Sequence, residues 1–150
     1  MQLTRKETEL LKDLKENEKL CAEKYSKHAH CAKDSQLKDL FTQISDVERG
    51  HLNTLTQIEG GTTPQMGGGS QTQPAFQETY SASDTADKQA DGYLCADVLA
   101  AEKHASHGYD VCVFEFRDAA VRDTLNHIQK EEHEHGKMIY DYMEKNHMYS

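Results

Sequence analysis

The sequence predicts an all-α protein, an antiparallel four-helix bundle of two hairpins joined by a long crossover linker. Three observations predict this fold. Apolar residues recur at alternating steps of three and four along most of the 150-residue chain. Both prolines and five of the nine glycines fall within 59–83, a segment of linker composition. The two flanking arms also repeat each other. We therefore expect one domain, 1–150, with a first hairpin at 1–58, a linker at 59–84 and a second hairpin at 85–150.

The apolar positions form four stripes, each with the spacing of helices that pack against their neighbours at a shallow angle. Asp34 and Asp118 stand just before the second and fourth stripes, where an aspartate can cap the first turn of a helix. Because the connections at these two points are short, each pair of helices should form an antiparallel hairpin. The stripes predict helices near 3–32, 35–58, 85–115 and 119–145.

The charge balance argues against some classes of function. The chain has 17 Lys and Arg against 26 Asp and Glu, a net charge of −9, so we expect no nucleic-acid partner. No apolar run approaches the ~20 residues of a membrane-spanning helix, so we expect no membrane partner. The N-terminal residues carry charges where a secretory signal needs an apolar stretch, which favours a cytoplasmic protein. The four cysteines form no CxxC pair and are expected to be free thiols.

An internal repeat relates the two arms, since a shift of 84 residues superposes them without a gap. Asp34 then falls on Asp118, and Ile44 falls on Ile128. A repeat this long indicates a duplicated helical hairpin rather than a solenoid. The shift also pairs the polar residues of the stripes: Glu18 with Glu102, Glu48 with Glu132, His51 with His135, and Tyr25 with Tyr109.

Six polar residues on the stripes form a metal-ligand pattern. Two helices each carry one glutamate, and the other two each carry Glu-x-x-His on one face, which is the ligand pattern of di-iron and di-manganese carboxylate bundles. Each glutamate lies 15 residues from the middle of its hairpin turn, at position 33 or 117. At ~1.5 Å per residue, every glutamate sits roughly 22 Å from the turn, so the set shares one level. The six residues are Glu18, Glu48, His51, Glu102, Glu132 and His135.

The charge of these glutamates indicates the kind of ligand they would take. Two divalent cations would offset four carboxylates, and carboxylate with imidazole suits iron well. We expect two Fe ions, with Mn or Zn as alternatives. Without metal, carboxylates in an apolar seam would repel one another and carry a desolvation penalty. No Lys or Arg lies on the stripes to pair with them. The alternative is that these side chains face water in a loosely packed bundle.

Tyr25 and Tyr109 each lie seven residues after a glutamate of the set, two turns along the same face. A phenol at that position can hydrogen-bond a ligand carboxylate across the bundle. The alternative is a core tyrosine whose hydroxyl is satisfied elsewhere. The other charged residues of the run EEHEH fall off the stripe and are expected to form a solvated face: Glu131, His133 and Glu134.

With all six residues of the paired E…ExxH motif, the chain resembles the ferritin-like superfamily, which includes ferritins, bacterioferritins and rubrerythrins. The resemblance covers about 9–58 and 90–145. It implies a four-helix bundle with a dinuclear iron site. It also implies terminal ligands at Glu18 and Glu102, bridging ligands at Glu48 and Glu132, and one nitrogen per ion from His51 and His135. The chain lacks a rubredoxin module, so its electron donor would be another protein.

The C-terminal arm carries a second set of marker residues: Asp97-Val98-Leu99, Lys103, the region of Arg122, His135, Met143 and the ending MEKNHMYS. In these residues it resembles a second family, the coat F proteins of bacterial spore coats. This resemblance implies a role in the spore and does not imply a metal, because many coat F-like chains lack a complete ligand set. The present chain departs from them by keeping all six residues. It also has His147 where that family usually has glycine.

Two functions are therefore expected. The first is a dinuclear iron or manganese centre that reacts with O₂ or peroxide as an oxidase or peroxidase and draws electrons from an external donor. The second is a structural spore coat component whose site is vestigial or only stabilises the fold. In either case we expect the cytoplasm of a sporulating bacterium, with deposition in the spore coat, and a homodimer or coat assembly as the macromolecular partner.

Overall fold

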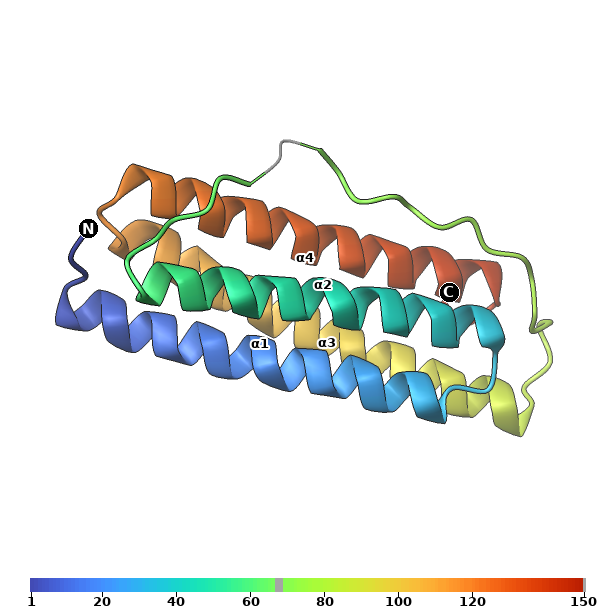
Figure 1. Cartoon of the computed structure of the whole chain (residues 1–150). Helices are drawn as coiled ribbons and strands as arrows, with labels where there is room; N and C mark the ends of the chain where they lie inside the picture. The colour runs from blue at the N-terminus through green and yellow to red at the C-terminus, as the bar shows by residue number, and fades with distance from the viewer. Residues whose placement is uncertain (67–68, 150) are drawn as a thin grey trace.

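A computed structural model describes residues 1–66 and 69–149, and within them it contains four helices and no strand. The helices are α1 (Arg5–Cys31), α2 (Ser35–Glu59), α3 (Ala86–Glu115) and α4 (Ala119–Lys145). Figure 1 shows them side by side, with a long connection that returns along the bundle from α2 to α3. The predicted all-α four-helix bundle is confirmed. Positions 67 and 68 of the predicted linker, and position 150, lie outside the described residues.

Capping side chains explain where the helices begin. Asp34 accepts a hydrogen bond from the backbone N–H of Gln36 (3.2 Å), and Asp118 accepts one from Val121 (3.1 Å), so both predicted N-caps are present. The first helix begins two residues later than expected because Thr4 forms a capping box with Glu7. These caps satisfy N–H groups that the first helical turn leaves without an intrahelical partner.

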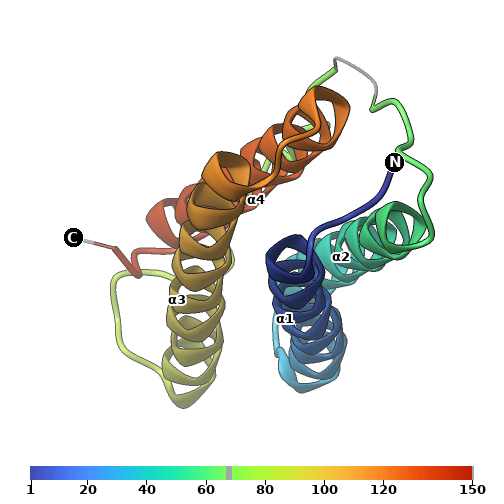
Figure 2. The same ribbon diagram turned by 90° about the vertical axis from the view of Figure 1, so that its left-hand side faces the viewer.

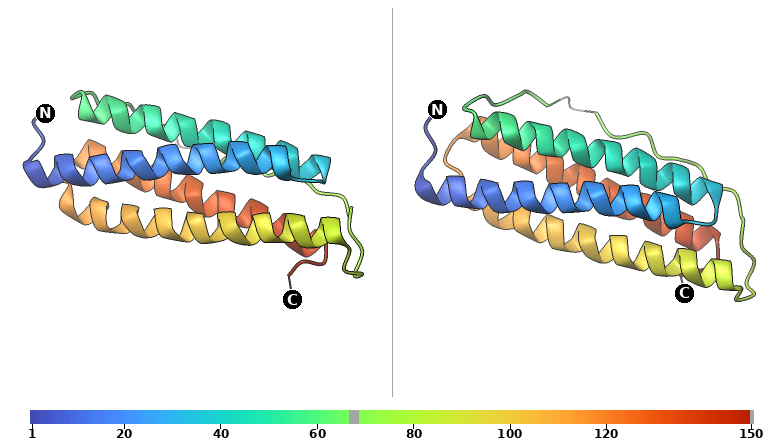
Figure 3. Two further views of the ribbon diagram at one scale, coloured as in Figure 1. Left: turned by 90° about the horizontal axis from the view of Figure 1, so that it is seen from below. Right: turned by 60° about the horizontal axis from the view of Figure 1, so that its bottom comes forward.

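The four helices are not equally close to one another. Helix α1 packs extensively on α2, α3 packs on α4, and α1 also packs on α3, whereas α2 and α4 make the fewest contacts of these pairs. Figure 2 looks along the bundle and Figure 3 shows the helices sharing one long axis. The crossover linker contacts both α2 and α4, through the Gln36 amide to the Gln77 carbonyl (3.0 Å) and through Thr124 to the Pro64 carbonyl (3.3 Å). It therefore runs over the side where these two helices are least in contact.

Two apolar clusters form the core. One includes Tyr25, Phe41 and Tyr142, and the other includes Leu11 and Leu125, all of them fully buried. The six polar residues of the stripes belong to neither cluster, although they are buried as deeply. The core therefore holds a buried polar centre that its apolar residues flank.

A pair of equivalent contacts ties the two hairpins together at opposite ends. Near the start of α1, Glu7 accepts a hydrogen bond from the backbone N–H of Arg117 in the α3–α4 turn (2.9 Å). Near the start of α3, Asp91 accepts one from the backbone N–H of Lys33 in the α1–α2 turn (2.8 Å). These residues are related by the 84-residue shift. The duplication in the sequence is therefore a pseudo-twofold repeat in space.

All four cysteines are free in the structure, as expected: Cys21, Cys31, Cys95 and Cys112. Within the described part of the chain, no helix is both long enough and apolar enough to cross a membrane.

Candidate metal centre

The structure brings the six predicted residues together from all four helices. Each is buried, with at most 6% of its surface exposed. Their possible ligand atoms form two groups, and within each group the atoms lie within 4.8 Å of one another. The first group is Glu18, Glu48, His51 and Glu132, and the second is Glu48, Glu102, Glu132 and His135.

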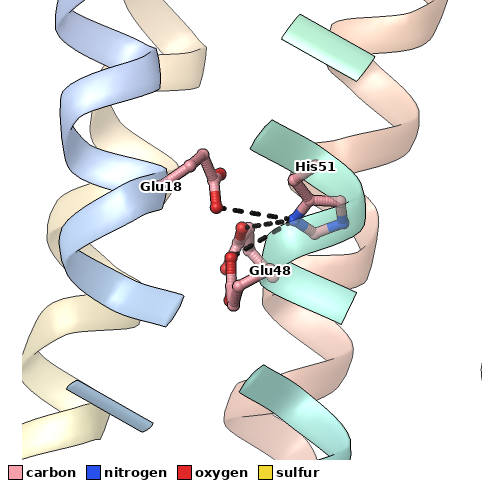
Figure 4. A group of neighbouring side chains, drawn as sticks. Glu18, Glu48 and His51 are labelled. Atoms are coloured by element: carbon pink, nitrogen blue, oxygen red, sulfur yellow. Dashed lines mark hydrogen bonds and ion pairs between the residues drawn. The ribbon is translucent and has the colours of Figure 1, made fainter. Parts of the chain in front are cut away.

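In the first group the carboxylates surround one nitrogen of His51. Its Nδ1 lies 3.1 Å from Glu132 Oε1, 3.3 Å from Glu48 Oε2 and 3.7 Å from Glu18 Oε2. Figure 4 shows Glu18 reaching from α1 toward Glu48 and His51 on α2. Three carboxylates and one imidazole nitrogen therefore converge on one volume, which is a ligand set suited to iron or manganese.

The second group repeats this arrangement around His135. Its Nδ1 lies 3.1 Å from Glu48 Oε1, 3.4 Å from Glu102 Oε1 and 3.6 Å from Glu132 Oε2. The two imidazole rings stack with their centroids 6.1 Å apart. Each of the shared glutamates, Glu48 and Glu132, directs one oxygen toward each histidine, so these two carboxylates can contact ions at both positions.

The two tyrosines bind the glutamates that are not shared. The Tyr25 hydroxyl donates to Glu102 Oε1 (2.6 Å) and the Tyr109 hydroxyl donates to Glu18 Oε1 (2.5 Å), each across the bundle. Of the two alternatives for these phenols, the structure therefore favours contact with the carboxylate set. Because each phenol occupies Oε1, the other oxygen of each carboxylate remains available.

The centre contains buried carboxylate oxygens that lack hydrogen-bond partners in the part of the chain that the structure describes. The buried Oε2 atoms of Glu18, Glu102 and Glu132 have no hydrogen-bond partner among the described residues. A buried acceptor without a partner costs about 1–3 kcal/mol, and more when it is charged. Three such atoms in one cluster are the arrangement that divalent cations would satisfy.

The pKa values reflect the same excess of negative charge. Burial and the neighbouring Glu48 raise the pKa of Glu18 to about 7, and burial with the Glu102 charge raises that of Glu132 well above its usual range. Burial acts to lower the pKa of His135, but hydrogen bonds to Glu102 and Glu48 raise it to about 9. The metal-free cluster therefore retains protons that divalent ions would displace.

Two residues outside the predicted set hold the far nitrogens of the histidines. His51 Nε2 lies 3.1 Å from Glu131 Oε1, and His135 Nε2 lies 2.9 Å from Gln71 Oε1. The expectation that Glu131 belongs to a solvated face is wrong, because its side chain is only 16% exposed and contacts His51. Glu134 is also partly buried, and its Oε2 accepts a hydrogen bond from the backbone N–H of Gln71, whereas His133 is exposed as expected.

The sequence contained a weak signal for Glu131 and none for Gln71. Glu131 lies one turn before His135 on α4, next to a predicted ligand, but its position off the apolar stripe indicates a surface residue. Gln71 lies in the linker, where no periodicity relates a residue to the helices. The roles of both residues follow from contacts between segments that are distant in the sequence.

A groove of about 580 Å³ between α3 and α4 reaches the centre from outside. Glu102 and Glu132 lie at its floor, and Leu99, Gly136 and Tyr140 line its walls. Glu102 is 6% exposed, the most among the four glutamates of the centre, whose other members are at most 1% exposed. No atom lies within 4 Å of the place where a Cβ of Gly136 would be. This side of the centre is therefore the accessible one.

The comparisons with known proteins bear on the second hairpin. Residues 90–150 match the family model described as the Coat F domain. This match covers less than half of the chain and supports the resemblance to the coat F family that the C-terminal arm shows. A search of curated proteins found no match, and neither did a search of solved structures. The ferritin-like resemblance remains a prediction.

Proposed function

We propose that this chain is a spore coat-associated protein with a dinuclear metal centre, holding two iron or two manganese ions and reacting with O₂ or peroxide. Glu18 and Glu102 would each bind one ion, Glu48 and Glu132 would bind both, and His51 and His135 would each give Nδ1 to one ion. The observation that carries the proposal is the convergence of these six buried side chains into two groups that share two carboxylates.

Charge supports two divalent cations at this centre. Four ionised glutamates bring a charge of −4 into an apolar core, and among the described residues their ion-pair partners are His51 and His135 rather than a Lys or Arg. Ions with a total charge of +4 would neutralise them and satisfy the three orphaned carboxylate oxygens. Zinc would fill the same ligand set without providing redox chemistry.

The chemistry of the centre would come from the metal. Two ferrous ions would supply two electrons, which reduce one hydrogen peroxide, with two protons, to two water molecules. The phenols of Tyr25 and Tyr109 would keep Glu18 and Glu102 oriented during this reaction. Apolar clusters flank the centre, and a separate reductant would return the ions to the ferrous state.

The α3–α4 groove provides the route by which a small oxidant would reach the centre. It ends on Glu102 of α3 and Glu132 of α4, which both belong to the second group of candidate ligands. We infer that O₂ or peroxide enters here rather than through the α1–α2 side, where Leu52 occupies the position equivalent to Gly136.

The direct test is an anaerobic titration of the metal-free full chain with Fe²⁺, followed by addition of peroxide. The expected result is two ions per chain and oxidation of both by one peroxide, measured by absorbance. Mn²⁺ and Zn²⁺ are titrated in parallel to compare their affinities. Failure to bind two ions of any of these metals would refute the dinuclear centre.

A structural coat component is the second candidate function, and the Coat F match over the second hairpin favours it. In that case metal would only stabilise the bundle. The same titration separates the two functions, because tight zinc binding without peroxide turnover by the iron form supports the structural one.

A further inference from the structure

We propose that Gln71, in the crossover linker, is a positioning residue for His135 and makes the two metal positions of the centre inequivalent. The inference rests on the proposed dinuclear centre and concerns a residue outside its ligand set. Gln71 makes three contacts with α4: its Oε1 with His135 Nε2 (2.9 Å), its Nε2 with the Glu131 carbonyl (3.1 Å) and its backbone N–H with Glu134 (2.9 Å).

These contacts determine which way the Gln71 amide points. The Glu131 carbonyl can only accept a hydrogen bond, so the NH₂ group of Gln71 must face it. The carbonyl oxygen of the amide must then face His135. An oxygen accepts, so Nε2 of His135 must carry a proton and donate. In the neutral imidazole, Nδ1 is then the nitrogen with the free lone pair, and Nδ1 is the atom that faces the carboxylates.

The repeat explains why a linker residue takes this part. His51 on α2 is held through Nε2 by Glu131 on α4. The equivalent partner for His135 would be the residue 84 positions before Glu131, which is Val47 on α2. Valine has no side-chain acceptor, so α2 cannot bind His135 in this way. Gln71 provides the missing acceptor from the linker, on the side where α2 and α4 are least in contact.

The two histidines therefore have acceptors of different charge. A carboxylate, Glu131, accepts from His51, whereas a neutral amide, Gln71, accepts from His135. A charged acceptor makes the imidazole a stronger donor to a metal than a neutral one does. The ion bound at His51 should therefore bind more tightly, and the ion at His135 should depend on the linker.

The test uses the metal-free full chain titrated with Co²⁺ alone, whose absorbance reports each ion as it binds. The wild type should take up two Co²⁺ in two steps. Gln71→Leu should weaken the second step by about 10- to 100-fold, the usual effect of removing a partner that holds a ligand histidine, and change the first by less than about threefold. Gln71→Glu keeps an acceptor for His135 Nε2 but loses the N–H donor to the Glu131 carbonyl, so its second step should recover most of the affinity that Gln71→Leu loses. Gln73→Leu, at an exposed linker position, is the matched control and should match the wild type.

Two further backgrounds identify the ion that responds. In His51→Ala only the position at His135 remains complete, so adding Gln71→Leu should weaken its Co²⁺ by the same factor. In His135→Ala, adding Gln71→Leu should have no effect. Circular dichroism checks that each variant keeps the wild-type helical content.

Three results would overturn the inference in distinguishable ways. If the wild type binds no Co²⁺, the proposed centre and this inference fail together. If the wild type binds two ions and Gln71→Leu binds them equally well, only the role of Gln71 fails. If both steps weaken alike and Gln71→Glu does not restore them, Gln71 acts on the fold as a whole and positions no particular ligand.

Discussion

The two hairpins of this protein carry the same polar centre and differ in what surrounds it. Tyr25 binds Glu102 as Tyr109 binds Glu18, and each hairpin provides one Glu and one Glu-x-x-His. Around this repeated set the hairpins have diverged. The second hairpin carries Glu131 where the first has Val47, and Gly136 where the first has Leu52.

The pattern of similarity and difference indicates what each part does. Residues that face the centre repeat, and two metal ions held as proposed above would each take the same types of ligand from this repeated set. Residues one step outside it differ because the groove opens on one side only, and because the two histidines are held by different partners, Glu131 for His51 and Gln71 for His135. The second hairpin therefore has the accessible groove and depends on the linker, and it is also the half that matches the Coat F domain.

The largest effect should come from removing the two shared carboxylates together. Metal at 100 times its dissociation constant stabilises the native state by about 2.7 kcal/mol per independent site. With two ions bound at this saturation, the wild type should lose about 5 kcal/mol on chelation. The Glu48→Ala/Glu132→Ala variant should unfold at nearly the same temperature with and without chelator. Thermal unfolding by circular dichroism measures both. A chelator effect of equal size in the double variant would show that stabilisation comes from another site.

The next largest loss of stability is expected from removing the equivalent hydrogen bonds of Asp91 and Glu7 at the two ends of the bundle. Asp91 is fully buried and accepts from two backbone N–H groups and the Tyr80 hydroxyl, so Asp91→Ala should cost about 3 kcal/mol. Glu7 accepts from the backbone N–H groups of Thr4 and Arg117, and Glu7→Ala should cost about 2 kcal/mol. Urea unfolding measures both variants. A larger loss for Glu7→Ala would contradict the ranking.

Lowering the pH should reduce the stability that the hydrogen bonds of Glu7 contribute. Burial acts to raise the pKa of Glu7, but hydrogen bonds from Thr4 and Arg117 outweigh it and lower the pKa from 4.5 to about 2. A depressed folded-state pKa contributes stability that is present above the unfolded value and lost as pH falls through the folded one. The advantage of the wild type over Glu7→Gln should therefore shrink between about pH 4.5 and about pH 2. An advantage that is constant across this window would exclude a contribution from the charge.

Replacing each of the two tyrosines tests whether the two repeated tyrosine–glutamate contacts contribute equally to stability. Tyr25→Phe and Tyr109→Phe each leave a buried carboxylate oxygen without its donor, at a cost of about 1–3 kcal/mol. Because the two contacts are related by the repeat, the two losses should agree within about 0.5 kcal/mol, the usual error of such comparisons. Chemical denaturation of the metal-free variants measures them. Clearly unequal losses would show that the pseudo-symmetry does not extend to energies.

The smallest effect on stability, with a distinct effect on reactivity, is expected at Gly136. Replacing a helical glycine should stabilise the helix by about 0.5–1 kcal/mol, and the space around its Cβ position is open. Gly136→Leu copies Leu52 and should slow oxidation of the iron-loaded protein by peroxide, measured by stopped-flow absorbance, with two ions still bound. Gly136→Ala gains the same helix propensity without filling the groove and should react at the wild-type rate. Equal rates for Leu and Ala would place the route elsewhere.

The amino-acid sequence alone determined the helices and the polar centre. Helix bounds agree with expectation within two residues because stripes and caps such as Asp118 are local features, read from a few neighbouring positions. The six ligand candidates were identifiable because a repeat of 84 residues and equal distances from two turns place them at one level.

Only the tertiary structure decided what contacts this centre from outside. Gln71 belongs to a segment without periodicity, so its place against His135 depends on how the linker crosses α4. Glu131 lies on a helix face that becomes partly buried only when His51 of another helix packs beside it. The groove at Gly136 likewise depends on the separation of α3 and α4. Local patterns specify which face of a helix is apolar, whereas distances between helices depend on all the side chains packed among them.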